Sequence, residues 1–207
     1  MGLLRLLLND PGTFILLVIP LLYSVIIHEV AHGWVADKMG DSTARWLGRL
    51  SLDPRRHLDP VGTIMLFVFG FGWAKPVPVN FGNLRDYRKG LVLVSAAGIT
   101  ANIILAFLAM LVLSTAHLSL FSPLSRALQY LAQINIMLAS FNLIPIPPLD
   151  GSKILMGFSS RRFQYTLQRL EPYGFFIIIG LLYLGVLDPL IGFFQWLIMS
   201  LIGLIIG

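Results

Sequence analysis

An apolar stretch near the start of the chain, residues 14–27, limits the possible folds more than any other feature. Asp10 and Pro11 precede it in the pattern of a helix start, and Gly40 follows it as a residue that typically ends a helix. A helix over about residues 12–39 exceeds the roughly 20 residues that cross a bilayer. We therefore expect this stretch to span a membrane.

The composition of the whole chain also indicates a membrane protein. Hydrophobic residues make up 57% of the 207 positions, and charged residues only 12%, against about 25% in a typical soluble domain. We expect a single membrane-embedded domain over residues 1–207. The chain contains no cysteine, which excludes disulfides and thiolate ligands. Any metal must therefore be held by His, Asp or Glu.

Further apolar stretches predict the remaining architecture. Residues 91–113 and 127–143 fit two more spans, and residues 172–206 fit a final hairpin of two spans. Residues 61–71 are too short to cross a bilayer and predict a short re-entrant helix, ended by residues 70–73. The expected fold is an all-α polytopic membrane protein with about five transmembrane helices.

Prolines at positions 76 and 78 forbid a helix there and favour a small extended, β-like loop. A plain connecting loop is the alternative.

Basic residues predict the orientation. Residues 37–58, 73–89 and 148–172 hold thirteen of the 15 Lys and Arg residues, so the positive-inside rule places them in the cytoplasm. We interpret residues 159–169 as a polar, basic loop. Residues 114–126 hold only one arginine and are expected on the outer side.

The five residues His28 to His32 follow the first apolar stretch and contain two histidines four residues apart, with a glutamate directly after the first. Two histidines four apart share one face of a helix, close enough to bind one metal ion. Glu29 can act as general base beside that ion. The chain has only two glutamates and four histidines, and three of these six residues lie here. Because such residues are costly in a membrane helix and usually functional, we favour a metal site over an exposed charged turn.

A catalytic zinc site needs a third protein ligand and one open position. Asp150 follows an apolar tail broken by prolines, residues 141–149, and such backbone at membrane depth usually lines a cavity. Zinc with Asp150 and Glu29 has a net charge of zero, which lowers the cost of burial. Asp150 is the best candidate, although capping the next helix explains it equally by spacing, and His57 or Asp59 are possible.

Asn102 is the strongly polar side chain in the middle of its span. It either forms a hydrogen bond between helices or faces the metal cleft and donates to a substrate carbonyl, and spacing does not decide between these. The small residues Gly98, Thr100 and Ala101 let helices pack closely.

This set of groups predicts hydrolysis of a peptide bond by water. Glu29 would take the proton of the attacking water and pass it to the leaving amine. A helical substrate hides its amides, so it must unwind first. Segments 76–81 and 142–148 offer edges with which the unwound strand can pair.

Together, residues 28–33, 72–80, 98–102 and 142–151 resemble the site-2 protease family of intramembrane zinc metalloproteases. The resemblance covers about residues 12–157, and the final hairpin matches nothing specific. It implies that Asp150 joins His28 and His32 as the third ligand of one Zn²⁺ ion. It also implies that Asn102 and Asn142 help to bind the substrate backbone or the intermediate.

The resemblance further implies cleavage in or near transmembrane segments of membrane proteins, known as regulated intramembrane proteolysis. We expect a short form without a PDZ domain, in a bacterial cell membrane, with the active site toward the cytoplasm. Its partners are transmembrane substrates and lipid, with no nucleic acid. The alternatives are a membrane metal transporter, which gives Glu29 no role and predicts related halves, or an inactive zinc-binding scaffold.

Overall fold

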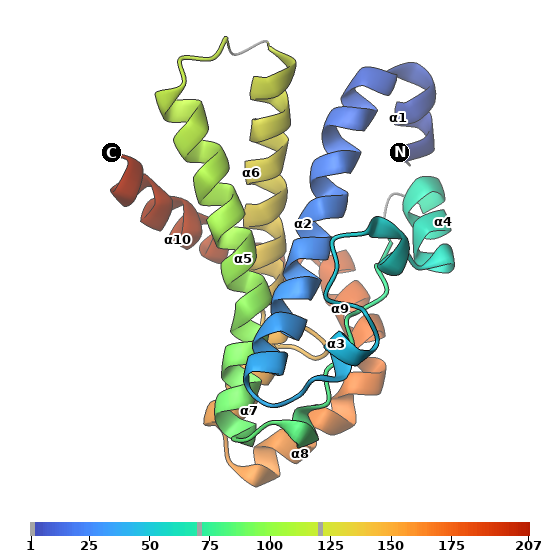
Figure 1. Ribbon diagram of the computed structural model, residues 1–207, viewed down its shortest axis with the longest axis vertical. Helices are drawn as coiled ribbons and strands as arrows, with labels where there is room; N and C mark the ends of the chain where they lie inside the picture. The colour runs from blue at the N-terminus through green and yellow to red at the C-terminus, as the bar shows by residue number, and fades with distance from the viewer. Residues whose placement is uncertain (1–2, 70–71, 120–121) are drawn as a thin grey trace.

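The computed structural model describes residues 3–69, 72–119 and 122–207, which form a bundle of helices (Figure 1). Across these residues there is no β-sheet, and strand pairing is limited to an isolated bridge between Leu58 and Ala74. The predicted all-α fold is confirmed. The helices are α1 (Leu3–Asn9), α2 (Pro11–Lys38), α3 (Thr43–Trp46), α4 (Pro60–Phe69), α5 (Tyr87–Thr115), α6 (Pro123–Asn142), α7 (Asp150–Phe158), α8 (Arg161–Leu170), α9 (Gly174–Tyr183) and α10 (Asp188–Ile206).

Helix α2 begins and ends where the sequence predicts. The Asp10 side chain caps the helix by accepting a hydrogen bond from the Thr13 N–H at 3.0 Å. At the other end Gly40 has a φ of +115°, which glycine adopts without strain. The N–H of Asp41 then returns to the carbonyl of Ala36 at 2.9 Å, so α2 ends in a Schellman motif.

The centre of the molecule is built by α2, α5 and α6, which lie side by side, with α10 packed across α5 and α6 (Figure 1). Fully buried Ala106 and Ala139 lie in this contact, and small side chains let helices approach closely. The buried core of this contact consists of Ile99, Ala106, Ile136, Ala139, Ile198 and Ile202.

Three helices among the described residues are long and apolar enough to cross a membrane: α2, α5 and α10. The chain is therefore an integral membrane protein. The predicted number of about five spans is not reached by this criterion. Helix α6 has 20 residues but is interrupted by polar side chains, and α9 has only 10 residues. Of the hairpin predicted at residues 172–206, only α10 has the length of a span.

Between α2 and α5 lies a long connection that contains the short helices α3 and α4. The bridge from Leu58 to Ala74 brings together the segments before and after α4. The Phe67 ring of α4 packs on the Phe14 ring of α2, with ring centroids 5.9 Å apart. Residues 70 and 71, where we expected α4 to end, lie outside the described residues.

After α4 comes the proline segment, residues 74–80, which forms neither helix nor sheet. The absence of a helix agrees with its alternating prolines, and a plain connecting loop describes the segment as well as a β-like loop does.

Two predictions about the polar connections were wrong. Residues 161–170 are not a loop but form α8, because Gln164 and Leu167 are buried on one face while three arginines occupy other positions of the helix. The connection predicted at residues 114–126 is shorter, since Ser122 caps α6 and Arg126 already lies inside that helix.

The basic segments gather toward one end of the molecule. Figure 1 shows the end of α2, the start of α5 and α8 at this end, while the start of α2, the end of α5 and the start of α6 lie at the other. Parts of all three basic segments thus lie toward the same end of the molecule.

Candidate metal centre

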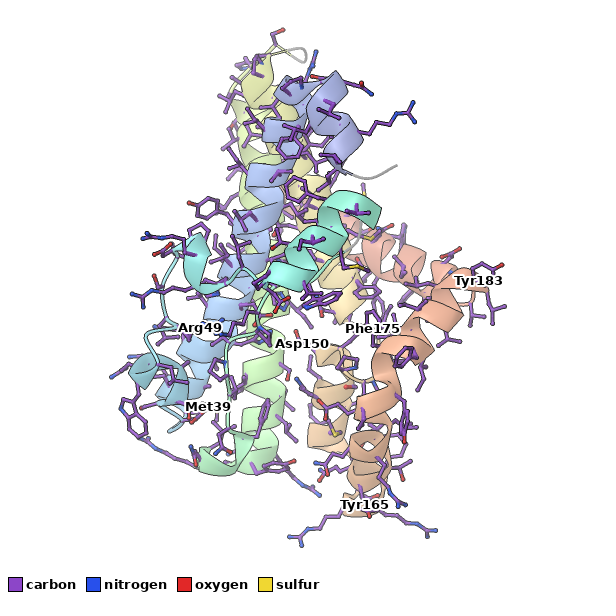
Figure 2. The ribbon with its side chains drawn as sticks, turned by 90° about the vertical axis from the view of Figure 1, so that its right-hand side faces the viewer. Met39, Arg49, Asp150, Tyr165, Phe175 and Tyr183 are labelled. Atoms are coloured by element: carbon purple, nitrogen blue, oxygen red, sulfur yellow. The ribbon has the colours of Figure 1, made fainter. Side chains whose placement is uncertain are left out.

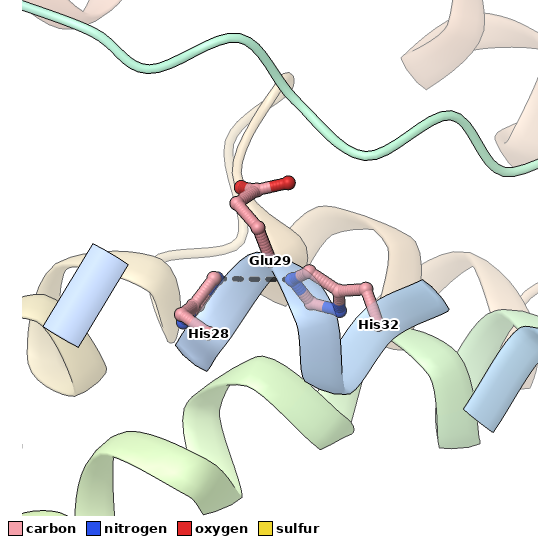
Figure 3. A group of neighbouring side chains, drawn as sticks. All are labelled: His28, Glu29 and His32. Atoms are coloured by element: carbon pink, nitrogen blue, oxygen red, sulfur yellow. Dashed lines mark hydrogen bonds between the residues drawn. The ribbon is translucent and has the colours of Figure 1, made fainter. Parts of the chain in front are cut away.

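Helix α2 presents His28 and His32 on one face, one turn apart. Both side chains are buried, and their Nε2 atoms lie 2.9 Å apart. The two rings meet edge to face with centroids separated by 4.6 Å, and Figure 3 shows them converging beside the helix. The spacing of four residues therefore produces a pair of nitrogen donors, as the sequence predicts.

Asp150 reaches the same point from a distant part of the chain. Its Oδ2 atom lies 3.1 Å from Nε2 of His28 and 3.1 Å from Nε2 of His32. Asp150 is the first residue of α7, and Leu149 occupies the position before the helix. The two distances show that the Asp150 carboxylate faces the histidines. The alternative that Asp150 is the N-cap of the next helix is wrong, because Leu149 occupies the N-cap position.

Hydrogen bonds to the outer ring nitrogens fix how both histidines face the centre. Nδ1 of His28 lies 2.5 Å from the side-chain oxygen of Asn102, and Nδ1 of His32 lies 2.7 Å from the carbonyl oxygen of Val94. These oxygens accept only, so each Nδ1 must carry the proton. Each Nε2 is then left with its lone pair directed at Asp150 and the other histidine.

The orientation of Asn102 is itself fixed by a buried network. Its amide nitrogen donates to the side-chain oxygen of Asn135 on α6 at 2.7 Å. The amide nitrogen of Asn135 donates in turn to the hydroxyl of Ser24 on α2 at 2.7 Å. All three side chains are completely buried. Because the Asn102 nitrogen is engaged by Asn135, its oxygen must face His28.

The sequence analysis missed Asn135 and Ser24. A usable signal exists for Ser24, which lies four residues before the first histidine and therefore on the same helix face.

Helix α5 packs directly against the two histidines at Gly98. A Cβ atom at this position would lie 2.5 Å from Nε2 of His32 and 2.6 Å from Nε2 of His28. Only glycine leaves that space open beside the donor atoms. Asn102 lies one turn further along the same face of α5, so this helix both makes room for the centre and supports it.

Glu29 points to another side of the centre. Its Oε2 atom accepts a hydrogen bond from the backbone N–H of Val77, in the proline segment, at 2.8 Å. Figure 3 shows the Glu29 carboxylate directed away from the two rings. Ligating atoms of His28, Glu29 and His32 nevertheless lie within 4.8 Å of one another. One water molecule can bridge such a distance, because each hydrogen bond to oxygen takes about 2.5–3.2 Å.

The proline segment is held in place by side chains from the loop after α2. The Arg49 guanidinium donates to the carbonyls of Lys75 and Pro76 at 2.8 and 3.1 Å. The Asp41 carboxylate accepts from the backbone N–H of Asn80 at 2.7 Å. These contacts lie on both sides of Val77, so they set the distance from this segment to Glu29.

Asp41 is a buried acid whose pKa is shifted. Burial raises its pKa, but hydrogen bonds from the Thr43 hydroxyl, the Asn83 amide and the backbone of Asn80 and Thr43 outweigh this. The pKa of Asp41 therefore lies below its ordinary value. Its carboxylate is ionised at neutral pH and anchors the end of the proline segment.

The donor set fits a zinc ion. Nε2 of His28, Nε2 of His32 and Oδ2 of Asp150 form a triangle with sides of 2.9, 3.1 and 3.1 Å. Ligands at the usual bond lengths of about 2.0–2.1 Å in a tetrahedron lie about 3.3 Å from one another, so small adjustments suffice. Two neutral imidazoles and one carboxylate are common zinc ligands, and the space kept by Gly98 adjoins both nitrogens.

Three other residues that the sequence analysis named as candidates make contacts that differ from their predicted roles. The Asn142 amide donates to the carbonyl of Leu138 on its own helix at 3.0 Å, and no contact with the histidines is found for it in the described chain. Asn102 is buried with both ends of its amide engaged, which differs from the expected contact with substrate. His57 is buried and bonds the Ser51 carbonyl at 2.7 Å, so it supports a loop.

Comparison with known proteins agrees with this geometry. A profile described as Peptidase family M50 matches residues 114–185, which include Asp150. YwhC of Bacillus subtilis is 43% identical over 172 residues, which cover 80% of this chain and 78% of YwhC. Rip2 of Mycobacterium tuberculosis H37Rv is 34% identical over 193 residues, which cover 88% of this chain and 71% of Rip2. The chain belongs to peptidase family M50.

The names of both relatives contain the words zinc metalloprotease. This M50 protein is accordingly a zinc metalloprotease, and zinc is its cofactor, in agreement with the group of His28, Glu29 and His32, which could hold a metal ion. Membership also confirms the resemblance seen in its motifs. No solved structure was found to match this M50 chain.

Proposed function

We propose that this M50 protein hydrolyses peptide bonds in or near transmembrane segments of other membrane proteins, in regulated intramembrane proteolysis. The observation that carries the proposal is the place of the donor triangle. His28 and His32 belong to α2, which is long and apolar enough to span a membrane. A hydrolytic centre on such a helix meets substrates that share the bilayer.

We assign His28, His32 and Asp150 as the zinc ligands and Glu29 as the general base. Zinc bound at the triangle supplies a Lewis acid that polarises a carbonyl and acidifies water. Oε2 of Glu29 is engaged by the Val77 N–H, so we assign Oε1 to the proton transfer. Glu29 takes the proton of the attacking water and then delivers it to the leaving amine, without an acyl-enzyme.

We further assign Asn102 as the residue that orients His28 through its Nδ1 proton. Such partners of metal ligands raise ligand basicity and fix the ring. Asn142 stays our candidate for contact with the substrate backbone, since it ends α6 at the start of the turn that leads to Asp150.

The proline segment is our candidate for holding the unwound substrate. It lies beside Glu29 and is not part of any sheet. Added strands bind through main-chain hydrogen bonds, so a substrate paired here would present its backbone to the general base.

We propose that the basic end of the molecule faces the cytoplasm, following the charge bias. The active site then lies toward the cytoplasmic side of a bacterial cell membrane, and α4 with the proline segment forms the re-entrant element.

The test is cleavage of a panel of single-span membrane proteins by the purified chain. We expect the wild type to cleave at least one. The Glu29→Gln variant should lose about 10²–10⁴-fold in rate, the usual contribution of a general base, while it still binds one zinc ion. Asp150→Ala should lose both zinc and activity.

Each other outcome rejects part of the proposal. Equal rates for wild type and Glu29→Gln would remove Glu29 as the base. Zinc in both without cleavage of any substrate would contradict the proposed reaction. Zinc transport into vesicles is then the next measurement, because a metal transporter is the competing function.

A further inference from the structure

An apolar cavity of about 520 Å³ lies beside the metal centre, between α9, the end of α6 and the turn that precedes α7. This volume falls within the range of about 300–1,000 Å³ found for small-molecule pockets. The residues that matter below are Gly72, Phe141, Leu149, Phe175 and Leu182.

Two residues that line this cavity are close in the chain to the proposed catalytic groups. Leu149 lines the cavity and is followed in the chain by Asp150, the proposed ligand. Consecutive Cα atoms are about 3.8 Å apart, so this wall and the ligand share one stretch of backbone. Gly72 also lines the cavity and precedes the proline segment, in which Val77, five residues further on, donates a hydrogen bond to Glu29.

The outer margin of the cavity joins these two parts of the chain. The rings of Trp73 and Phe175 meet edge to face with centroids 6.2 Å apart. Phe175 is 46% exposed and Leu182 is 39% exposed, so the cavity opens to the outside along α9. A substrate segment that lies along α9 can reach it.

We propose that this cavity is the side-chain subsite that selects a large apolar residue of the substrate next to the cleaved bond. The inference rests on the proposed function and names the substrate feature that the same site recognises. Because the walls are apolar, a charged side chain cannot enter without losing its solvation. Lipid tails are as apolar as the cavity, so moving an apolar substrate side chain from lipid into the cavity gains little free energy. The selectivity for the substrate residue therefore comes from the fit of its side chain and from the exclusion of charged side chains.

The experiment measures kcat/KM of the full-length chain on a single-span substrate whose cleavage site has been mapped. Each position around the cut is replaced in turn by Leu, Phe, Ala, Trp and Asp. For the wild type we expect one position at which Leu or Phe is preferred over Ala by about 10-fold, the lower range for a missing apolar group. Asp at that position should reduce cleavage further.

Two enzyme variants should move this preference in opposite directions. Leu182→Trp narrows the cavity and should favour Ala over Leu at that position. Phe175→Ala widens it and should raise cleavage of the Trp substrate relative to Leu by about 10-fold.

A neighbouring residue on the same helix gives a matched control. Tyr183 is 89% exposed and Phe176 is 73% exposed, and neither lines the cavity. Figure 2 shows Phe175 and Tyr183, which both belong to α9. The Phe176 ring packs on Phe175 with centroids 5.7 Å apart, so Tyr183→Trp is the control that should leave the substrate preference unchanged. Zinc content serves as the measure of folding in all variants.

The outcomes separate this inference from the proposed function. Cleavage without a preferred position, or a preference that the two cavity variants do not shift, overturns the subsite while the protease stands. A uniform loss of rate for all substrate residues also overturns it, since only a structural role remains. Failure of the wild type to cleave any substrate rejects the proposed function and this inference with it.

Discussion

The two sides of the metal centre are built in different ways. On the ligand side, His28, Asn102 and Asn135 come from packed helices and bond one another through buried side chains. On the base side, Glu29 meets the backbone of the proline segment, which Arg49 holds from a loop. Helix packing fixes the proposed metal ligands, whereas loop contacts set the surface that a substrate would meet. Changes on the two sides should therefore have separable effects on zinc binding and on catalysis.

The largest effect on the ligand side is expected for Gly98→Ala. The new Cβ atom would lie 2.5–2.6 Å from the Nε2 atoms of both histidines, so the rings must shift. We expect zinc affinity to fall by about 100-fold or more, at the upper end of the effects seen for changes around metal ligands. Titration with zinc and metal analysis of the purified protein measure this.

Gly203→Ala is the control, because a Cβ atom there meets nothing within 4 Å. It should bind zinc normally and gain up to about 1 kcal/mol of stability. Normal zinc affinity in Gly98→Ala would contradict the close contact between α5 and the histidines.

A smaller effect is expected for Asn102→Ala. The variant removes the oxygen that orients His28 and leaves the Asn135 amide oxygen without its donor. Zinc affinity should fall by about 10–100-fold, and the free energy of unfolding by about 1–3 kcal/mol. Asn102→Asp keeps an acceptor for His28 and should bind zinc more tightly than Asn102→Ala. If both variants bind zinc equally, Asn102 does not act through His28.

The base side can be tested with Arg49→Ala. The change removes the donor to the carbonyls of Lys75 and Pro76, and the proline segment should lose its place beside Glu29. We expect kcat/KM to fall by about 10-fold, equivalent to about 1.4 kcal/mol, with unchanged zinc content. Arg55, which pairs with Asp53 on the surface, gives the control Arg55→Ala. A loss of zinc in Arg49→Ala would show that the two sides are not separable.

The smallest effect concerns pH and Asp41. Its pKa is lower in the folded state, so its ionised form contributes stability above the unfolded pKa of about 3.9. This contribution is lost as the pH falls through the folded pKa. Asp41→Asn should therefore lower Tm near neutral pH, and the difference from wild type should shrink in acid. An equal difference at all pH values would mean that the charge of Asp41 is not what anchors the segment.

The sequence predicted the parts of the centre that depend on local spacing. His28 and His32 follow from helix geometry alone, and Glu29 from its place beside them. Asp150 required the observation that prolines break an apolar tail, and spacing did not separate it from a helix cap.

What the sequence could not supply depends on contacts between helices. Gly98 is one glycine among 19, and only its closeness to the histidines explains it. The role of Asn102 was open for the same reason, since its partners Asn135 and Ser24 lie on other helices. Helix α8 was missed because its three arginines were interpreted as a loop, although Gln164 and Leu167 are spaced to share one buried face.

The contact between His28 and Asp150 joins positions that are 122 residues apart in the chain. A metal ion held by both would therefore act as a cross-link that closes a very long loop, and closing such a loop restricts the unfolded chain strongly. Zinc thus has a structural value apart from its chemistry. Its removal would take away this link between α2 and the start of α7, which follows directly on Leu149 in the wall of the apolar cavity.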